Sequence, residues 1–142
     1  DHIQKASGIT CREAVDGEEV VAGRIYLAPG DFHMLVRAGG GGCRIALDKG
    51  PQENFCRPAA DPMLRSLTKI YGPKLLVAVL TGLGSDGARG ASEVVAGGGT
   101  VVAQDEATSV VYGMPKAVVD AKLASAVLPL PRVAPYLIKA VA

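Results

Sequence analysis

Apolar residues in the second half of the chain form short runs separated by helix-spaced patterns. The mostly apolar runs at residues 75–80 and 100–104 predict buried strands, because strands of parallel sheets are covered on both faces. Between them, residues 87–96 are expected to form a helix that ends at three consecutive glycines. This β-α-β order predicts two parallel strands whose carboxyl ends lie on one edge of a sheet.

Further elements are predicted on both sides of this unit. Asp61 followed by Pro62 is typical of a helix N-cap and first helical position, and the helix is expected to end at Gly72. Its apolar positions recur at helical spacing, at Met63, Leu64, Leu67 and Ile70. The last quarter of the chain is expected to add a helix from Pro115 to about Lys122, a strand at 126–128 and a helix from Pro131.

The first sixty residues predict strands and loops. Residues 19–27 are expected to form a strand, and residues 32–37 and 43–47 flank four glycines as in a β-hairpin. Residues 48–60 read as a loop. Because an α/β domain normally alternates strands and helices from its beginning, we expect residues 1–142 to be the later part of a larger domain whose N-terminal strands are lacking.

Composition supports one α/β domain with an aliphatic core. The 142 residues are 49% hydrophobic but only 4% aromatic, and none is Trp. This favours a doubly wound, mostly parallel sheet with helices on both faces, in three layers. The net charge of +1, without blocks of like charge, leaves no electrostatic footprint for nucleic acid. The aliphatic run at 75–80 is far shorter than the roughly 20 residues of a membrane helix, so no membrane insertion is expected.

Cysteine and histidine positions give little sign of a catalytic or metal site. Cys11, Cys43 and Cys56 have no C-x-x-C spacing, which argues against a disulfide framework or a zinc site and favours the reducing cytoplasm. Cys11 and Cys43 fall in predicted strands. Cys56, beside an arginine, is a weak candidate for an activated thiol. Of the two histidines, His33 is interpreted as structural, and the other lies near a terminus that is expected to fray.

The turn after the strand at 75–80 supports two competing functions. Gly82, Gly84 and Gly87 have the G-x-G-x-x-G spacing of a dinucleotide site, and acidic residues follow at close to the expected interval of about 20 residues, at Asp105 and Glu106. Against this, Asp86 places a negative charge where a pyrophosphate would sit. A simpler interpretation is that the glycines make a tight turn and that Asp86 caps the following helix.

A self-contained hydrolase is not predicted from local motifs. Ser85 lacks the G-x-S-x-G setting of a nucleophile elbow, because Leu83 stands where the first glycine should be. A dinucleotide-binding or non-catalytic α/β module therefore remains an alternative at this point.

Several motifs that follow one another along the chain indicate a protein family far more specifically than the glycine spacing does. These are RIYLAPGDFHM at 24–34, NFCRPAAD at 54–61, LTGLGSDGARG at 80–90, AQDEATSVVYGMPKAVVD at 103–120 and LPL at 128–130. Across about residues 11–136, the chain closely resembles the catalytic domain of the chemotaxis protein-glutamate methylesterases, the CheB family.

The resemblance implies a cytoplasmic serine hydrolase that removes methyl groups from glutamate methyl esters of chemoreceptors and deamidates receptor glutamines, without a cofactor. Asp86 matches the aspartate of the family's Ser-His-Asp triad, and four residues are expected near the active site: Leu83, Gly84, Met114 and Pro115. Leu83 stands where the family commonly has methionine. The implied partners are the methylated cytoplasmic region of chemoreceptors and a regulatory receiver domain.

The resemblance also implies that two triad members are missing. The family's serine and histidine motifs lie upstream of the matched region, and His33 aligns with a family histidine that is not the triad base. We therefore expect residues 1–142 to form the C-terminal part of a methylesterase domain that is inactive alone.

Overall fold

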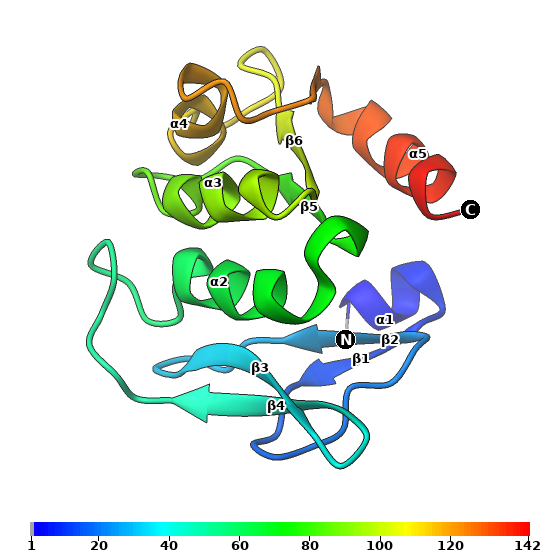
Figure 1. Cartoon of the computed structure of the whole chain (residues 1–142). Helices are drawn as coiled ribbons and strands as arrows, with labels where there is room; N and C mark the ends of the chain where they lie inside the picture. Colours follow the sequence, from blue (N-terminus) through cyan, green and yellow to red (C-terminus); the bar gives the residue numbers. More distant parts are fainter. Residues whose placement is uncertain (1) are drawn as a thin grey trace.

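The computed structural model describes residues 2–142, which form three sheets with helices packed between and around them (Figure 1). The strands are β1 (Thr10–Glu13), β2 (Arg24–Leu27), β3 (His33–Gly39), β4 (Gly42–Asp48), β5 (Leu76–Val79), β6 (Thr100–Gln104) and β7 (Ala126–Leu128). The helices are α1 (His2–Ser7), α2 (Ala60–Tyr71), α3 (Ala88–Ala96), α4 (Met114–Asp120) and α5 (Leu130–Val141), and a short 3₁₀ turn, η1 (Gly72–Lys74), follows α2.

The parallel sheet predicted for the second half is confirmed. β6 pairs in parallel with β5 on one side and β7 on the other. As the middle strand it is almost completely buried from Val101 to Gln104, which explains its apolar sequence. β1 and β2 form a second parallel pair, while β3 and β4 form the predicted antiparallel hairpin. The architecture is therefore α/β with a mostly parallel arrangement of strands.

Helix α2 joins the two hydrophobic cores. In Figure 1 it lies between the β3–β4 hairpin and α3. One core gathers around α3, α4 and the parallel sheet, with Val94, Val101 and Val118 fully buried. The other packs on the hairpin, and Met63 and Leu67 of α2 contact both. Helix α2 thus ties the hairpin to the parallel sheet and its helices.

One sequence prediction in the first half is wrong. Residues 19–27 do not form one strand, because the start of the segment pairs with β4, where the Val20 amide donates to the Cys43 carbonyl, and its end pairs with β1. Gly23, with φ of 80°, reverses the chain between them. Near the start of the chain, His2–Ser7 form α1, and the side chain of Gln4 accepts a hydrogen bond from the Cys11 amide.

The predicted N-cap of α2 is wrong as well. The helix begins at Ala60, Ala59 occupies the cap position without a side-chain hydrogen bond, and Asp61 lies within the first turn. The Asp61 side chain is only 1% exposed and is directed at α3. A contact with another helix has therefore replaced the local cap.

None of the helices in the described part of the chain combines the length and apolar content needed to cross a bilayer.

Gly90 permits the close contact between α2 and α3. A Cβ atom at this position would lie 2.7 Å from the Leu64 Cβ and 3.1 Å from an Asp61 carboxylate oxygen. Alanine is about 1 kcal/mol better than glycine in a helix interior, but overpacking costs about 1–3 kcal/mol. Here the neighbours are a buried side chain and a buried carboxylate, so the steric cost should outweigh the gain.

We expect Gly90→Ala to lower the free energy of unfolding of the full-length protein, measured by urea denaturation, despite the better helix propensity of alanine. Ser92→Ala, at an exposed position of the same helix, is the matched control and should change stability by less than about 0.5 kcal/mol. Equal or increased stability of Gly90→Ala would show that α2 and α3 can separate without cost.

Candidate functional site

Asp86 lies in the glycine turn that follows β5 at the carboxyl end of the parallel sheet, as predicted. The residue is 7% exposed, and its neighbours Gly84 and Gly87 have left-handed backbone conformations. Carboxyl ends of parallel strands are where open α/β folds place their chemistry. A buried carboxylate at this point needs several hydrogen-bond donors to replace water.

The carboxylate of Asp86 caps α2, the helix that precedes it in sequence. Its Oδ2 accepts a hydrogen bond from the Ala60 amide at 2.6 Å, and its Oδ1 accepts one from the Asp61 amide at 3.1 Å. The expectation that Asp86 caps the following helix is therefore wrong. The positive end of the α2 dipole lies against this negative charge and stabilises it.

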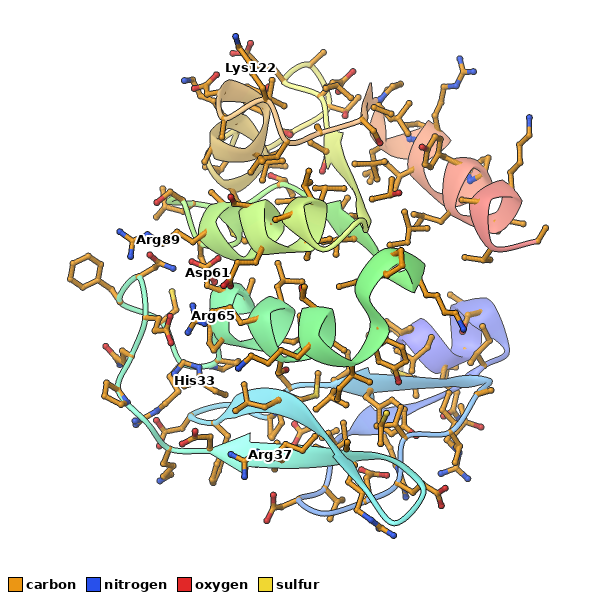
Figure 2. The ribbon with its side chains drawn as sticks, viewed as in Figure 1. His33, Arg37, Asp61, Arg65, Arg89 and Lys122 are labelled. Carbon is orange, nitrogen blue, oxygen red and sulfur yellow. The ribbon has the colours of Figure 1, made fainter. Side chains whose placement is uncertain are left out.

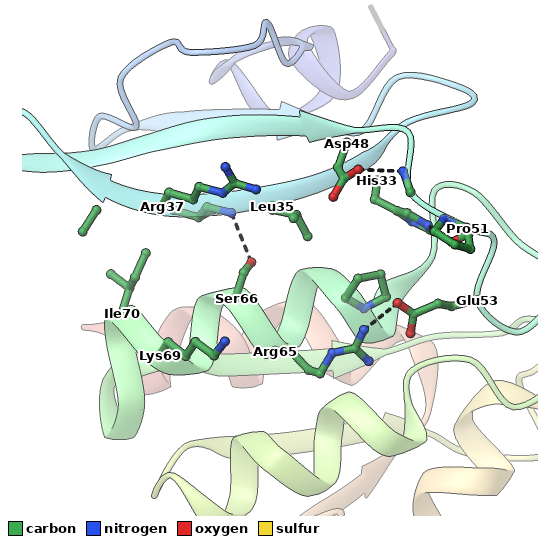
Figure 3. Close-up of a pocket in the computed structure, with 14 residues that line it drawn as sticks. His33, Leu35, Arg37, Asp48, Pro51, Glu53, Arg65, Ser66, Lys69 and Ile70 are labelled. Carbon is green, nitrogen blue, oxygen red and sulfur yellow. Dashed lines mark hydrogen bonds and ion pairs between the residues drawn. The ribbon is translucent and has the colours of Figure 1, made fainter.

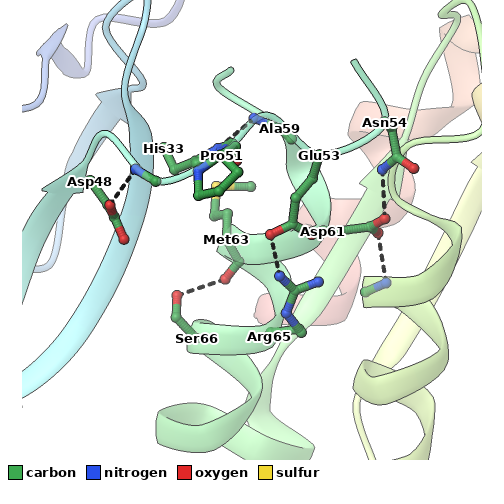
Figure 4. A network of polar contacts seen from close by, with 12 residues as sticks. His33, Asp48, Pro51, Glu53, Asn54, Ala59, Asp61, Met63, Arg65 and Ser66 are labelled. Atoms are coloured by element: carbon green, nitrogen blue, oxygen red, sulfur yellow. Dashed lines mark hydrogen bonds and ion pairs between the residues drawn. The ribbon is translucent and has the colours of Figure 1, made fainter. Parts of the chain in front are cut away.

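Asp61 performs the same task for α3. Its Oδ1 accepts hydrogen bonds from the Gly87 amide at 3.0 Å and the Gly90 amide at 2.7 Å, both at the start of α3. Figure 2 shows Asp61 between the two helices, and Figure 4 shows its contacts from close by. The two helices thus exchange capping aspartates: each N-terminus is closed by the carboxylate of the other segment.

Asn54 links the two aspartates. Its side-chain Nδ2 donates to Asp61 Oδ2 at 2.8 Å and to Asp86 Oδ1 at 2.9 Å. The backbone of Asn54 is left-handed, with φ of 54°, a conformation in which asparagine is enriched. Nothing in the local sequence pattern indicated these contacts, because the partners of Asn54 lie in α2 and in the turn after β5.

The loop that carries Asn54 is fixed by Arg57. The guanidinium donates to both the carboxylate of Asp31 and the carbonyls of Lys49 and Gly50. Hydrogen bonds from Arg57 and then Lys49 hold the pKa of Asp31 below its usual value. The loop is thereby tied to the turn that precedes the hairpin.

Two further contacts attach this loop to the fold. Arg65 of α2 donates to the Glu53 carboxylate at 2.5 Å, and this hydrogen bond raises the pKa of Arg65. His33 is buried, with Nε2 2.8 Å from the Pro51 carbonyl and Nδ1 accepting from the Ala59 amide. Both ring nitrogens are therefore engaged, with the proton on Nε2, and the structural interpretation of His33 is supported.

The glycine turn interlocks with the segment that leads into α4. The Gly82 carbonyl accepts hydrogen bonds from the amides of Gly113 and Met114. A Cβ at Gly113 would lie 2.7 Å from that carbonyl oxygen, so the two backbones touch where only glycine fits. Pro115, in the first turn of α4, is buried, whereas Leu83 is 85% exposed.

The groups that would bind a dinucleotide already form hydrogen bonds within the protein. The amides of Gly87 and Gly90, which would bind a pyrophosphate, are bonded to Asp61. Asp105, the candidate ribose ligand, accepts from both the backbone amide and the hydroxyl of Thr108 within its own loop. Both observations argue against the dinucleotide interpretation.

A separate cavity lies between the hairpin and α2 (Figure 3). It has a volume of about 600 Å³ and its lining includes Leu35, Arg37, Glu53, Arg65 and Lys69. Asp86 and Asn54 do not line it, so this groove and the carboxylate network are separate features. Among residues 2–142, no group of three or more His, Cys, Asp or Glu side chains is arranged to hold a metal ion.

The cysteines are dispersed. Cys11 is buried in β1, Cys43 is half-buried in β4, and Cys56 is exposed in the loop beside Asn54. None of them hydrogen-bonds to Asp86 or Asp61 in the described structure.

Chemically, the network orients the Asp86 carboxylate and leaves one of its acceptor positions without a donor among the described residues. A carboxylate offers about four acceptor positions, and three of those of Asp86 are filled by N–H donors. The remaining position belongs to Oδ2. Such a group can orient an imidazole and stabilise its charged form, which is the role of the acid in a Ser-His-Asp triad.

Comparison with known proteins identifies the family. The family described as CheB methylesterase matches residues 1–137. "Protein-glutamate methylesterase/protein-glutamine glutaminase 1" of Paramagnetospirillum magneticum is 56% identical over 139 residues, and the protein-glutamate methylesterase/protein-glutamine glutaminase of Azospirillum brasilense is 56% identical over 140 residues. Each match covers 98% of this chain but 36% of the relative, so the chain spans about a third of their length.

The fold agrees with a solved structure of the same family. The crystal structure of the Thermotoga maritima CheB methylesterase catalytic domain superposes with a TM-score of 0.94 at 43% sequence identity. The match covers 97% of this chain and 73% of that chain. On sequence and structure together, the chain belongs to the CheB methylesterase family.

Proposed function

We propose that the protein containing this chain is a cytoplasmic protein-glutamate methylesterase and glutamine deamidase, in which Asp86 is the acid of a Ser-His-Asp triad. The names of the relatives support the reaction class. The serine nucleophile and the histidine base would come from outside residues 1–142. In this proposal residues 1–142 form the C-terminal part of the methylesterase domain.

The observation that carries the proposal is the state of the Asp86 carboxylate. It is buried, it accepts from the Ala60 and Asp61 amides and from Asn54, and it keeps one acceptor position on Oδ2. A triad aspartate must hold its histidine in one tautomer while remaining unprotonated itself. A carboxylate that is oriented by three N–H donors suits that requirement.

The residues of this chain support the reaction without supplying the nucleophile. His33 uses both ring nitrogens within the fold, so it is not free to serve as the base. When the histidine takes the serine proton, the negative charge of Asp86 would stabilise the imidazolium. The serine oxygen would then attack the glutamyl carbonyl, releasing methanol from an ester or ammonia from an amide, and water would release the glutamate carboxylate.

The substrate we propose is a glutamate methyl ester in the methylated cytoplasmic region of a chemoreceptor, with a receiver domain as the regulatory partner. Leu83 and Gly84 lie in the turn that carries Asp86, and Met114 and Pro115 begin the helix locked against it. We propose that these four residues form the surroundings of the active site, with the exposed Leu83 side chain facing substrate. No cofactor is part of the proposal.

Replacing Asp86 by asparagine in the full-length protein should lower kcat by up to about 10⁴-fold with little change in KM, because the amide favours the wrong histidine tautomer. Methanol release from a methylated receptor fragment measures this. Asp120→Asn, which changes an exposed aspartate in α4, is the matched control and should leave kcat unchanged. A thermal melt of each variant separates loss of catalysis from loss of fold, and near wild-type turnover by folded Asp86→Asn would contradict the assignment.

A purified polypeptide of residues 1–142 should have no esterase activity above background. It supplies the acid of the triad alone, and removal of triad members leaves only residual catalysis. The assay is hydrolysis of the same receptor ester by equal concentrations of the polypeptide and the full-length protein. Comparable rates would mean that a nucleophile lies within these residues.

Titration of the full-length protein with NAD or NADP should give no heat and no shift in melting temperature. The Asp61 carboxylate already occupies the start of α3, where a pyrophosphate would bind. Saturable micromolar binding that is abolished by Gly84→Val would instead revive the dinucleotide interpretation.

A further inference from the structure

We infer that Asn54 is a positioning residue for Asp86: its side-chain amide holds the catalytic carboxylate in place and keeps it apart from the second buried carboxylate, Asp61. The inference rests on the proposed function and extends it to a residue in a different loop. It assigns to Asn54 an effect on turnover that acts through Asp86, without contact with substrate.

The geometry of the amide is the first argument. Nδ2 of Asn54 has two hydrogens, and it lies 2.8 Å from Asp61 Oδ2 and 2.9 Å from Asp86 Oδ1. Both hydrogens are therefore used, one on each carboxylate. Every other hydrogen bond to the Asp86 carboxylate in the described structure comes from a backbone amide, so Asn54 is its one side-chain donor.

Electrostatics gives the second argument. Asp61 and Asp86 are 1% and 7% exposed, and both lie within hydrogen-bond distance of the same nitrogen. Two carboxylates this close in a poorly solvated site repel each other. Each is stabilised by a helix N-terminus, and the positive edge of the amide lies between them. A side chain without donors at position 54 would leave that repulsion uncompensated.

Backbone conformation gives the third argument. Asn54 and Phe55 both have positive φ, 54° and 64°, and the Phe55 side chain is 97% exposed. Left-handed non-glycine residues are uncommon and persist where the surrounding structure enforces them. Here Arg57 and the Glu53–Arg65 ion pair fix the loop. The left-handed backbone at the tip of this loop directs the side-chain amide of Asn54 toward the carboxylates of Asp61 and Asp86.

Two substitutions at this position tolerate positive φ. Together they separate the effect of losing the hydrogen-bond donors from the effect of replacing them by acceptors. Asn54→Gly removes the donors, and Asn54→Asp keeps the shape but replaces donors by acceptors. In the full-length protein we expect kcat to fall on the order of 10²-fold, as for a small misplacement of a catalytic group, with KM unchanged. The loss should be greater for Asn54→Asp at neutral pH. Lys122→Gly, at an exposed position with φ of 60° beyond α4, is the control.

The pH dependence of kcat distinguishes a positioning role of Asn54 from a purely structural one. As pH falls, the carboxyl introduced by Asn54→Asp becomes protonated and can again donate one hydrogen bond. The ratio of its kcat to that of wild type should therefore rise toward acid pH, while the ratio for Asn54→Gly should stay flat. Folded variants with kcat within about threefold of wild type and parallel pH profiles would overturn the inference, even where Asp86→Asn abolishes turnover.

A second measurement does not depend on turnover. A double-mutant cycle on the unfolding equilibrium, with Asn54→Gly and Asp86→Asn, should show clear non-additivity because the residues share a hydrogen bond. Strict additivity would overturn the inference. An inactive wild-type protein with clear coupling in this cycle would instead contradict the proposed function and leave the positioning contact supported.

Discussion

The exchange of capping carboxylates between α2 and α3 is the interaction on which the site depends. Asp86 closes the N-terminus of α2, and Asp61 closes that of α3. Each helix end supplies the donors that allow the other segment's carboxylate to be buried. Asp86 thus stabilises the fold and also has catalytic potential, and the free-energy cost of burying its carboxylate is offset by the cap that it provides for α2.

Local patterns in the sequence predict the second half of the fold well. β6 and β7 were predicted residue for residue, and α3 within one residue, because apolar runs and glycine stops are short-range signals. The segment at 19–27 failed because its two ends pair with different sheets. A local sequence pattern does not indicate which neighbouring strand a half-exposed segment will pair with.

The site was only partly predictable for the same reason. The position of Asp86 followed from the strand before it, yet its partners lie on a helix and a loop that precede it by some thirty residues. The Asp61–Pro62 pair fits the local pattern of a helix N-cap, so the sequence predicted that role for Asp61. Asn54 fits no local pattern that would have indicated its contacts. Contacts between distant segments decide which carboxylate serves which helix, and only the folded chain displays them.

The close contact between the backbones at Gly82 and Gly113 constrains some positions of the site to one residue type and leaves others free to change in sequence. No side chain fits at Gly113, so the path of the turn is fixed by the main chain alone. Leu83 projects from that fixed path into solvent. The side chain at position 83 can therefore change without moving Asp86. Under the proposed function, this separates the surface that meets the substrate from the carboxylate that serves the reaction.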